Sequence, residues 1–508
     1  MNLKKLYLIL PALIQWSKID PVSAGALRQH DFLAALQTAP EPEIKLGPQG
    51  WTARVVDSLG FGRRNRRADP YKSLTQYKDD LVLRFTISNE AEARAIAGAA
   101  NQLFLDVWSA SNKSMDIRLS PHDLPLVLSF LPESMKNNYT PMMSNILDPI
   151  PQSRIEGQKT DTLFFGDYQP WNVILPWMKL LESMFPSYVE LLTIGQTHEG
   201  RDIHALKVGA SEEEDGKRRR ADGEKRRTVI ITGAAHAREW ISVSTVNYLA
   251  YSIITGYAKN DKGIDAMVNN IDWIFIPTVN VDGYVYTWEK DRLWRKNRQP
   301  TNLAFCQGID LDRAYDFHFD NSPQSAANPC SEMFPGNYAF QATESKAFVQ
   351  WAETYTKNNS AKIIGLLDLH SYSQQILYPY SYSCDHPPPD LENLEELGIG
   401  LAKAIQVQSG ERYEVAAACE GTGFASFPST TGSGSMLDYF YAKLKVAWTY
   451  QIKLRDTGSY GFLLPKENII PTGEEMLNLV KYFAQFVLDD GGPTFARARK
   501  NSPGSDEL

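Results

Sequence analysis

Three short apolar runs, separated by segments of helical periodicity, constrain the fold of this chain most strongly. The runs are TVIIT at 228–232, WIFIPTV at 273–279 and IIGLLDL at 363–369. Because they are apolar on both parities, they fit strands that are buried on both faces of a largely parallel sheet. Helical patterns such as ISVSTVNYLAYSII at 241–254 lie between the runs. The sequence therefore predicts an α/β domain with a doubly wound, mixed and largely parallel sheet.

A smaller unit precedes this domain. Between 78 and 146 the chain alternates strand-like and helix-like runs, which read DLVLRFTI, EAEARAIAGAANQLFLDVW, SMDIRLS and DLPLVLSFL. This βαβ-like order predicts a small α/β sandwich. The predicted order is a signal peptide (1–24), an N-terminal extension (25–75), the sandwich (76–150), a turn-rich linker (151–166), the large domain (167–490) and a polar tail (491–508).

One stretch of the large domain carries almost no apolar residues. It reads SEEEDGKRRRADGEKRR at 211–227, acidic first and then basic. Such a composition cannot bury enough apolar surface to order a segment, so it predicts a surface insertion with no role in packing.

The N-terminal residues predict entry into the secretory pathway. Lys4 and Lys5 precede an apolar run that ends at Trp16, and Val22-Ser23-Ala24 offers small residues for cleavage. Four cysteines suit an oxidising compartment, and three glycosylation sequons, at Asn112, Asn138 and Asn358, are usable there. We expect a secreted or vacuolar protein; retrieval to the endoplasmic reticulum through the terminal SDEL is a weaker alternative.

The remaining composition limits the partners. No later apolar run approaches the ~20 residues of a membrane span. The formal charge of −8 on 508 residues gives no reason to expect a nucleic acid as partner. The expected partner is therefore neither a nucleic acid nor the interior of a membrane.

Two strand ends carry residues suited to a metal. His236 and Glu239 follow the run TVIIT, three residues apart, so both side chains lie on one side of a single turn. His370 ends the run IIGLLDL. Ligands bind at the carboxyl ends of strands in doubly wound sheets, and three N and O donors with a fourth position open match a catalytic zinc site. Asp310 could orient a histidine ring from outside.

Five motifs follow one another in this part of the chain. They are HAREW, DGYVYTWEKDRLWRKNR, GIDLDRAYD, LHSYSQQILYPY and LRDTGSYGFLLP, beginning at 236, 282, 308, 369 and 454. In this order they resemble the motifs of the zinc metallocarboxypeptidases of the carboxypeptidase A type. The resemblance covers about 165–490 and implies the carboxypeptidase-like fold, with the sandwich as a prosegment. It also implies one Zn²⁺ per chain, bound by His236, Glu239 and His370.

The resemblance assigns further roles. It implies substrate binding through Arg238, Arg295, Asp312, Arg313, Ser371 and Tyr372, because guanidinium groups fork onto carboxylates. It pairs Cys306 with Cys330, which leaves Cys384 and Cys419 for a second disulfide.

The chain departs from active members of that family at the catalytic base. Lys453 stands where they have a glutamate. The surrounding segment predicts a strand with one face in a core, because its apolar residues share one parity: Val446, Trp448, Tyr450, Ile452 and Leu454. Lys453 lies on the opposite parity. A zinc ion nearby would lower the pKa of a lysine by roughly two units from ~10.4. Lys453 would then remain protonated at neutral pH and could not accept a proton.

Two further departures concern substrate placement. Asp312 replaces an asparagine of the carboxylate-binding pair, and no tyrosine lies between Tyr413 and Tyr439, where active members carry a mobile one. Leu437 occupies the specificity position, so we expect an apolar pocket.

Together these departures resemble the fungal inactive metallocarboxypeptidases linked to the extracellular matrix and the cell wall. The sequence therefore predicts an inactive zinc-binding homologue that binds a peptide or a cell-wall component. One alternative is an active carboxypeptidase of altered specificity with Lys453 as its base. The other is a storage or structural protein whose zinc only stabilises the fold.

Overall fold

The computed structural model describes residues 70–111, 113–147, 164–210, 213–214, 217–218, 226–320, 328–358, 361–421 and 432–489. All of them belong to one compact unit, Leu59–Leu508. The predicted signal peptide, the polar tail with its SDEL ending, most of the extension, most of the linker and Asn112 lie outside the described residues. None of the described helices combines the length and apolar character needed to cross a bilayer.

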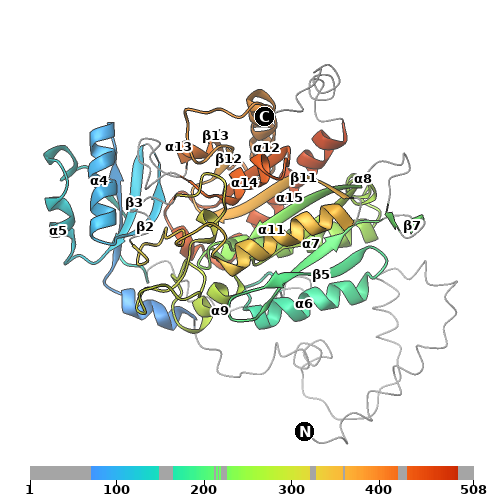
Figure 1. The fold of residues 1–508 in the computed structure, drawn as a ribbon, viewed down its shortest axis with the longest axis horizontal. Coiled ribbons are helices and arrows are strands. Elements are labelled where there is room, and N and C mark those ends of the chain that lie inside the picture. The colour runs from blue at the N-terminus through green and yellow to red at the C-terminus, as the bar shows by residue number, and fades with distance from the viewer. Residues whose placement is uncertain are drawn as a thin grey trace, which may run out of the picture. The chain divides into compact units, whose positions relative to one another are not determined.

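An eight-stranded mixed sheet organises the large domain (Figure 1). Its strand order is β13-β12-β14-β11-β9-β10-β6-β5. The pairs β10–β9, β9–β11, β11–β14 and β12–β13 are parallel, and the other three are antiparallel. The strands are β5 (Val189–Gln196), β6 (Asp202–Val208), β9 (Arg226–Gly233), β10 (Ile271–Ile276), β11 (Ala361–Ser371), β12 (Gln375–Tyr378), β13 (Glu414–Ala417) and β14 (Trp448–Leu454). The predicted α/β fold with its largely parallel sheet is confirmed.

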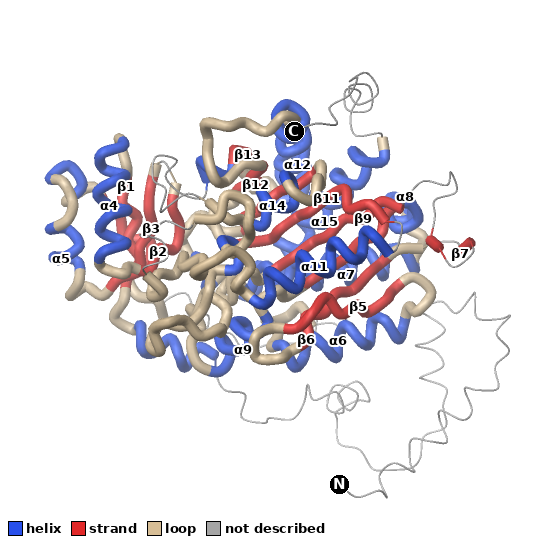
Figure 2. The backbone as a smooth tube through the Cα atoms, viewed as in Figure 1, coloured by secondary structure: helices blue, strands red, loops and turns tan. Residues whose placement is uncertain are grey.

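Helices cover both faces of this sheet (Figures 1 and 2). One face packs against α6 (Trp171–Met184), α7 (Trp240–Ala258), α8 (Lys262–Asn270), α12 (Leu391–Ser409) and α15 (Ile469–Leu488). The other packs against α11 (Thr343–Asn358), α14 (Met436–Ala442) and the 3₁₀ turn η6 (Leu311–Arg313). In β9, Val229 and Ile231 face the first core and Ile230 the second, which is why the run TVIIT is apolar on both parities.

Shorter elements complete the described large domain. They are the hairpin strands β7 (Glu213–Glu214) and β8 (Lys217–Arg218), the helices α9 (Val281–Glu289) and α13 (Ala418–Gly421), and the 3₁₀ turns η7 (Gly461–Leu463) and η8 (Lys466–Asn468).

Three neighbouring parallel strands bring the predicted site together. Leu369 of β11 is paired with Gly233 of β9, so both strands end at the same edge of the sheet. On the other side of β11, His370 is paired with Lys453 of β14. The residues that follow β9, end β11 and end β14 therefore meet at one carboxyl edge, which is where open α/β sheets bind ligands.

A four-stranded sheet of order β2-β3-β1-β4 forms the N-terminal sandwich, residues 81–143. Its elements are β1 (Leu81–Thr86), α4 (Glu90–Gln102), β2 (Asp106–Ala110), β3 (Ser114–Leu119), α5 (Leu124–Ser129), the 3₁₀ turn η4 (Glu133–Met135) and β4 (Tyr139–Met143), preceded by the 3₁₀ helix η3 (Pro70–Tyr77). Both α-helices cover one face of the sheet (Figure 1).

Three expectations from the sequence need correction. The helix-like run at 90–108 ends at Gln102, and Asp106 already belongs to β2. Phe164 and Phe165, placed in a linker, are buried in the large core, where Phe164 stacks on Trp177 at 4.4 Å between ring centroids.

The third correction concerns the insertion at 211–227, whose last residues do pack. Arg226 begins β9 and is buried. Its guanidinium pairs with Asp272 at 2.6 Å and donates to the carbonyls of Val268 and Asn269. Arg227 donates to the carbonyl of Val487 at 2.7 Å. Both arginines therefore belong to β9, and the buried guanidinium of Arg226 is tolerated because its charge is paired and hydrogen-bonded.

Candidate metal centre

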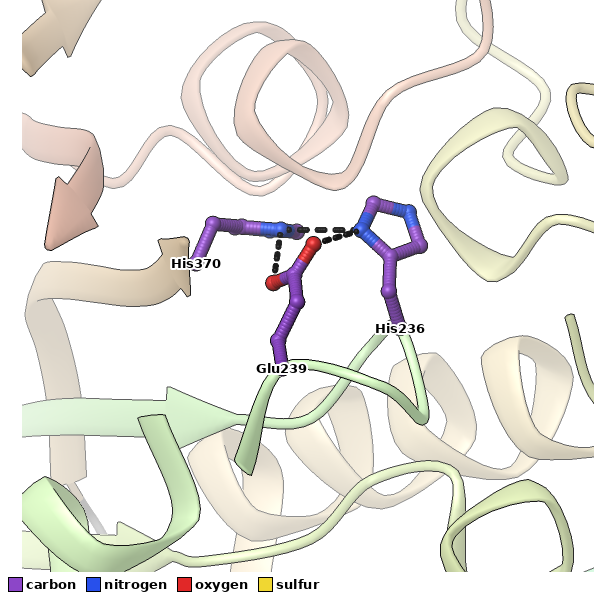
Figure 3. Close-up of side chains that lie close together, drawn as sticks. All are labelled: His236, Glu239 and His370. Atoms are coloured by element: carbon purple, nitrogen blue, oxygen red, sulfur yellow. Dashed lines mark hydrogen bonds and ion pairs between the residues drawn. The ribbon is translucent and has the colours of Figure 1, made fainter. Parts of the chain in front are cut away.

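His236, Glu239 and His370 converge on one point (Figure 3). His236 lies in the turn after β9, Glu239 immediately before α7, and His370 near the end of β11. Glu239 Oε1 is 2.8 Å from Nδ1 of His236, and Oε2 is 3.1 Å from Nδ1 of His370. The two Nδ1 atoms are 3.1 Å apart. All three side chains are buried.

The outer nitrogens of both rings contact carboxylates. Nε2 of His236 lies 3.0 Å from Asp310, as expected from the sequence, and Nε2 of His370 lies 2.7 Å from Asp368. Each carboxylate favours a proton on Nε2 and leaves the Nδ1 lone pair facing the centre. Two such nitrogens and one carboxylate are a zinc donor set, so these residues fit the ion that the resemblance implies.

Electrostatics keep Glu239 ionised. Burial alone would raise the pKa of this carboxyl group, but the two histidines hold it well below its usual range. The metal-binding form of the side chain is therefore its ordinary form at neutral pH.

Asp368, which contacts the candidate ligand His370, is not among the residues expected from the sequence. It is fully buried on β11, and its second oxygen accepts a hydrogen bond from Thr232 Oγ1 at 2.7 Å. The available signal was its position two residues before His370 in LDLH, because residues i and i+2 of a strand face the same side.

Lys453 lies at the end of β14, between β11 and β12 in the sheet. Its Nζ donates a hydrogen bond to the carbonyl of Gly421. The expectation that only one face of this strand enters a core is wrong, since Thr449 and Gln451 on the face of Lys453 are buried as well. Burial, more than any neighbouring charge, lowers the pKa of Lys453 to about 8. From the sequence we expected a shift of similar size, caused by a nearby zinc ion.

The arginines expected to bind substrate form two groups. Arg295 and Arg313 lie beside the candidate metal ligands, where Arg295 donates to Asp310 at 2.8 Å and Arg313 lies 3.6 Å from the same carboxylate. Arg238 is fully buried and points to the sandwich instead, where it pairs with Asp106 at 2.8 Å.

Tyr372 also engages the sandwich. Its hydroxyl donates to Asp116 at 2.8 Å, and the same carboxylate is held by Arg84 at 2.7 Å. Asp106 and Asp116 of the sandwich thus bind two of the side chains that were expected to bind substrate. No local pattern in the sequence identifies them, because their partners lie 132 and 256 positions away.

A cavity of about 140 Å³ lies between the metal ligands and the sandwich. Val107, Trp108 and Ser109 of β2 line one side, and the metal ligands line the other with Ser371, Lys453 and further polar residues. Leu437 is not among the lining residues. It is fully buried in a small cluster with Leu377 and Ala418, so the apolar pocket expected from it is wrong.

Asp312 and Gln451 form a polar part of the cavity wall. Asp312 accepts from Gln451 Nε2 at 2.8 Å and from the backbone N–H of Met436 at 3.2 Å. Burial raises the pKa of Asp312, because desolvation disfavours its charged form. Asp312 and Gln451 both line the cavity.

Two disulfides lie in the described part of the chain. They join Cys306 to Cys330 and Cys384 to Cys419, which are the pairs expected from the sequence.

A buried His-Glu-His centre at the carboxyl edge of a mixed sheet, with arginines beside it, defines a metallopeptidase-like site. A family model described as zinc carboxypeptidase matches residues 174–479. The inactive metallocarboxypeptidase ecm14 of Sclerotinia sclerotiorum is 49% identical over 501 residues, covering 92% of this chain and 82% of that protein. Its counterpart in Paracoccidioides brasiliensis is 48% identical over 469 residues, covering 86% and 78%.

A solved structure agrees with these relatives. The crystal structure of thrombin activatable fibrinolysis inhibitor matches with a TM-score of 0.67 and 26% identity, covering 81% of this chain and 100% of that one. The chain belongs to the zinc carboxypeptidase family.

Proposed function

We propose that this chain is a zinc-holding, catalytically inactive carboxypeptidase homologue that acts by binding, with a role in cell-wall organisation. The observation that carries the proposal is a complete His236–Glu239–His370 centre with Lys453 in place of a base. The names of its fungal relatives, inactive metallocarboxypeptidases, support the loss of catalysis. The link to the cell wall rests on the resemblance stated from the sequence.

Lys453 explains the loss of catalysis. A bound zinc ion would polarise a carbonyl group and acidify water in this family. The neighbouring residue must then accept a proton, and a lysine with a pKa of about 8 is mostly protonated at neutral pH. Losing a positioned base typically costs ~10²–10⁴ in rate. Asp312 adds repulsion where a peptide carboxylate would bind, and Arg238 is engaged by Asp106.

The proposed setting is the secretory pathway, with secretion or the vacuole as destination. Two disulfides support it, because they persist in oxidising compartments. Glycosylation at Asn138 remains a proposal, as it does at Asn112 and Asn358, whose side chains lie outside the described residues. The proposed partner is a peptide or a cell-wall component.

The first test is catalysis. Purified full-length protein is incubated with blocked dipeptides that end in apolar, acidic and basic residues, from mildly acidic to alkaline pH. We expect no turnover above the blank at any pH. Turnover that grows towards alkaline pH would instead identify Lys453 as a base, and the protein would be an active carboxypeptidase.

The second test is the metal. We expect about one zinc per chain by elemental analysis, because the three ligands are complete. His236→Ala and His370→Ala should each lose the ion, whereas His386→Ala, at an exposed histidine, should keep it. Stoichiometric zinc in the double variant of His236 and His370 would contradict the assigned centre.

A further inference from the structure

The end of α4 in the sandwich contributes a stripe of side chains to the wall of the cavity. The stripe consists of Ala97, Ala100, Asn101 and Phe104, which all line the cavity. Residues three and four apart on a helix lie on one face, so these side chains follow one another along the wall. Phe104 is 61% exposed and Asn101 is exposed as well. This stripe therefore borders the part of the cavity that meets solvent.

Phe104 occupies a backbone position that suits glycine. The N–H of Leu105 donates to the carbonyl of Ala100 at 2.9 Å, which closes a Schellman motif at the end of α4. Phe104 lies inside this motif with a φ of 54°, in the left-handed region that a Cβ atom disfavours. Neither the backbone nor burial accounts for a largely exposed phenyl ring at such a position. Strained positions of this kind are concentrated at binding sites.

The large domain supplies uncharged polar groups to the same wall, among them Asn328 and Ser331. Nδ2 of Asn328 donates to Oδ1 of Asn101 at 3.4 Å, and this link between the large domain and the sandwich is exposed. The Cys306–Cys330 disulfide holds the segment that carries Asn328. A side-chain amide has donors and an acceptor, which match the C=O and N–H groups of an extended peptide backbone.

Apolar side chains of both domains line the cavity beside these amides. They are Ala97, Ala100, Leu105 and Met115 of the sandwich and Met333 of the large domain. The cavity volume is about 140 Å³. An engineered apolar cavity of ~150 Å³ accommodates benzene, so this space admits one side chain of the size of leucine or phenylalanine.

The charges in the wall do not favour an ionic occupant. The carboxylates are Glu239, Asp312 and Glu332, and the cations are Arg295, Arg313 and Lys453. Because both signs are present, a charged side chain of either sign would meet a like charge and would also lose its hydration. An uncharged side chain avoids both costs.

We propose that the mouth of the cavity, formed by Asn101, Phe104, Asn328 and Met333, binds an extended peptide segment of a partner protein. One apolar side chain of the peptide enters the cavity against Phe104, and the peptide backbone bonds to Asn101 and Asn328. The proposal rests on the binding role given above and deepens it, since it selects a peptide and not a polysaccharide. The site uses no C-terminal carboxylate and no zinc, so it differs from the substrate positions that the family resemblance implies.

Isothermal titration calorimetry on the full-length protein tests this site. The probes are heptapeptides that are acetylated and amidated at their ends and carry Gly, Leu, Phe, Glu or Lys at the centre. We expect the Leu or Phe peptide to bind at least tenfold more tightly than the Gly, Glu and Lys peptides, with and without a zinc chelator.

Three variants separate binding from folding. Phe104→Gly should weaken binding at least tenfold without lowering the thermal midpoint, because glycine relieves the left-handed backbone. Asn101→Ala should weaken binding several-fold. Phe130→Ala is the matched control, because Phe130 is a 40% exposed phenylalanine of the sandwich that does not line the cavity, and it should bind as the natural protein does.

The remaining outcomes would overturn the proposal. They are equal binding by Phe104→Gly, preference for a charged central residue, binding that requires a free C-terminal carboxylate, and no binding. A β-glucan pentasaccharide that binds in a Phe104-dependent manner, where the peptides do not, would identify a polysaccharide site instead. Hydrolysis of dipeptides with free C-termini would defeat the proposed function and leave Phe104-dependent binding of amidated peptides intact.

Discussion

At the scale of single residues, the candidate metal site depends on carboxylates that contact the outer nitrogens of the histidines and are not ligands themselves. Asp368 accepts a hydrogen bond from Nε2 of His370 and another from Thr232, so both of its oxygens are used inside the core. This arrangement fixes which ring nitrogen faces the centre. Partners of this kind contribute to metal affinity without being ligands.

Asp368→Asn is therefore expected to weaken zinc binding by ~10–100-fold without abolishing it. An amide is a poorer acceptor than a carboxylate and leaves the imidazole less basic. Competition with a chromophoric chelator measures the affinity, and Asp385→Asn, at an exposed carboxylate, is the control. Unchanged affinity in Asp368→Asn would show that His370 is oriented by packing alone.

The residue scale also shows what the sequence could predict about the site. His236, Glu239 and His370 were accessible because strand ends and motif spacing are local properties. Asp310 was accessible only as a candidate carboxylate that could orient a histidine ring. The pairing of Arg238 with Asp106 was not accessible, because it depends on how two separately folded sheets meet.

At the scale of elements, a buried ion pair joins the start of β9 to the start of β10. Arg226 pairs with Asp272 at 2.6 Å, and each side chain is 3% exposed. Two carbonyls in the last turn of α8, those of Val268 and Asn269, accept hydrogen bonds from the terminal nitrogens of Arg226. The parallel pair β9–β10 therefore begins with a buried ion pair, which the apolar residues of both strands follow.

Asp272→Ala is expected to lower the free energy of unfolding by about 3 kcal/mol, because it leaves a buried guanidinium without its counter-charge. Urea denaturation followed by circular dichroism measures the change. The combined replacement Arg226→Met with Asp272→Leu should recover most of the loss, since an apolar pair can substitute for a buried ion pair.

The control for this prediction is Asp202→Ala, at an exposed aspartate of β6, for which we expect a change within about 0.5 kcal/mol. If the double replacement lowered the free energy of unfolding as much as Asp272→Ala does, the two side chains would stabilise the fold through their shape and not through their charges.

The same elements show where periodicity succeeds and fails. The central strands were predictable because residues facing both helix layers are apolar. Arg226 was assigned to the insertion because a run of basic residues looks solvated, yet its carboxylate partner lies 46 positions away. The helix at 90–102 was overextended because Leu103, Phe104 and Leu105 continue an apolar pattern across the turn into β2.

At the scale of the whole molecule, the sandwich forms one wall of the metal cavity. Leu74, Val82, Trp108 and Met143 share a buried cluster with Leu293, Tyr372 and Phe462 of the large domain. Ion pairs and hydrogen bonds cross the same interface, among them Asp106 to Arg238 and Asp116 to Tyr372. Apolar and polar contacts thus combine to close the cavity.

This closure should persist at mildly acidic pH. Burial alone would raise the pKa of Asp106, but Arg238 and Arg118 hold it well below its usual range. A carboxyl group with a depressed pKa contributes stability above its unfolded value of ~3.9 and loses it as the pH falls towards the folded value. We therefore expect the contribution of the Asp106–Arg238 ion pair to stability to stay constant between pH 7 and about 5, so that titration of Asp106 does not lower the thermal midpoint of the natural protein in this range.

The final prediction combines Asp106→Asn with Asp116→Asn in the full-length chain. Asp106→Asn leaves Arg238 buried without its counter-charge while the interface is closed, and Asp116→Asn weakens the acceptor of the Tyr372 hydroxyl, so opening of the interface should become easier by about 3 kcal/mol. Hydrogen–deuterium exchange should then accelerate roughly 100-fold at Asp106–Ala110 and leave the amides of β9 unchanged. Asp123→Asn, at an exposed aspartate of the sandwich, is the control. Unchanged exchange at β2 in the double variant would mean that the two carboxylates do not keep the cavity closed and that the other contacts of the interface, such as the apolar cluster around Trp108, suffice.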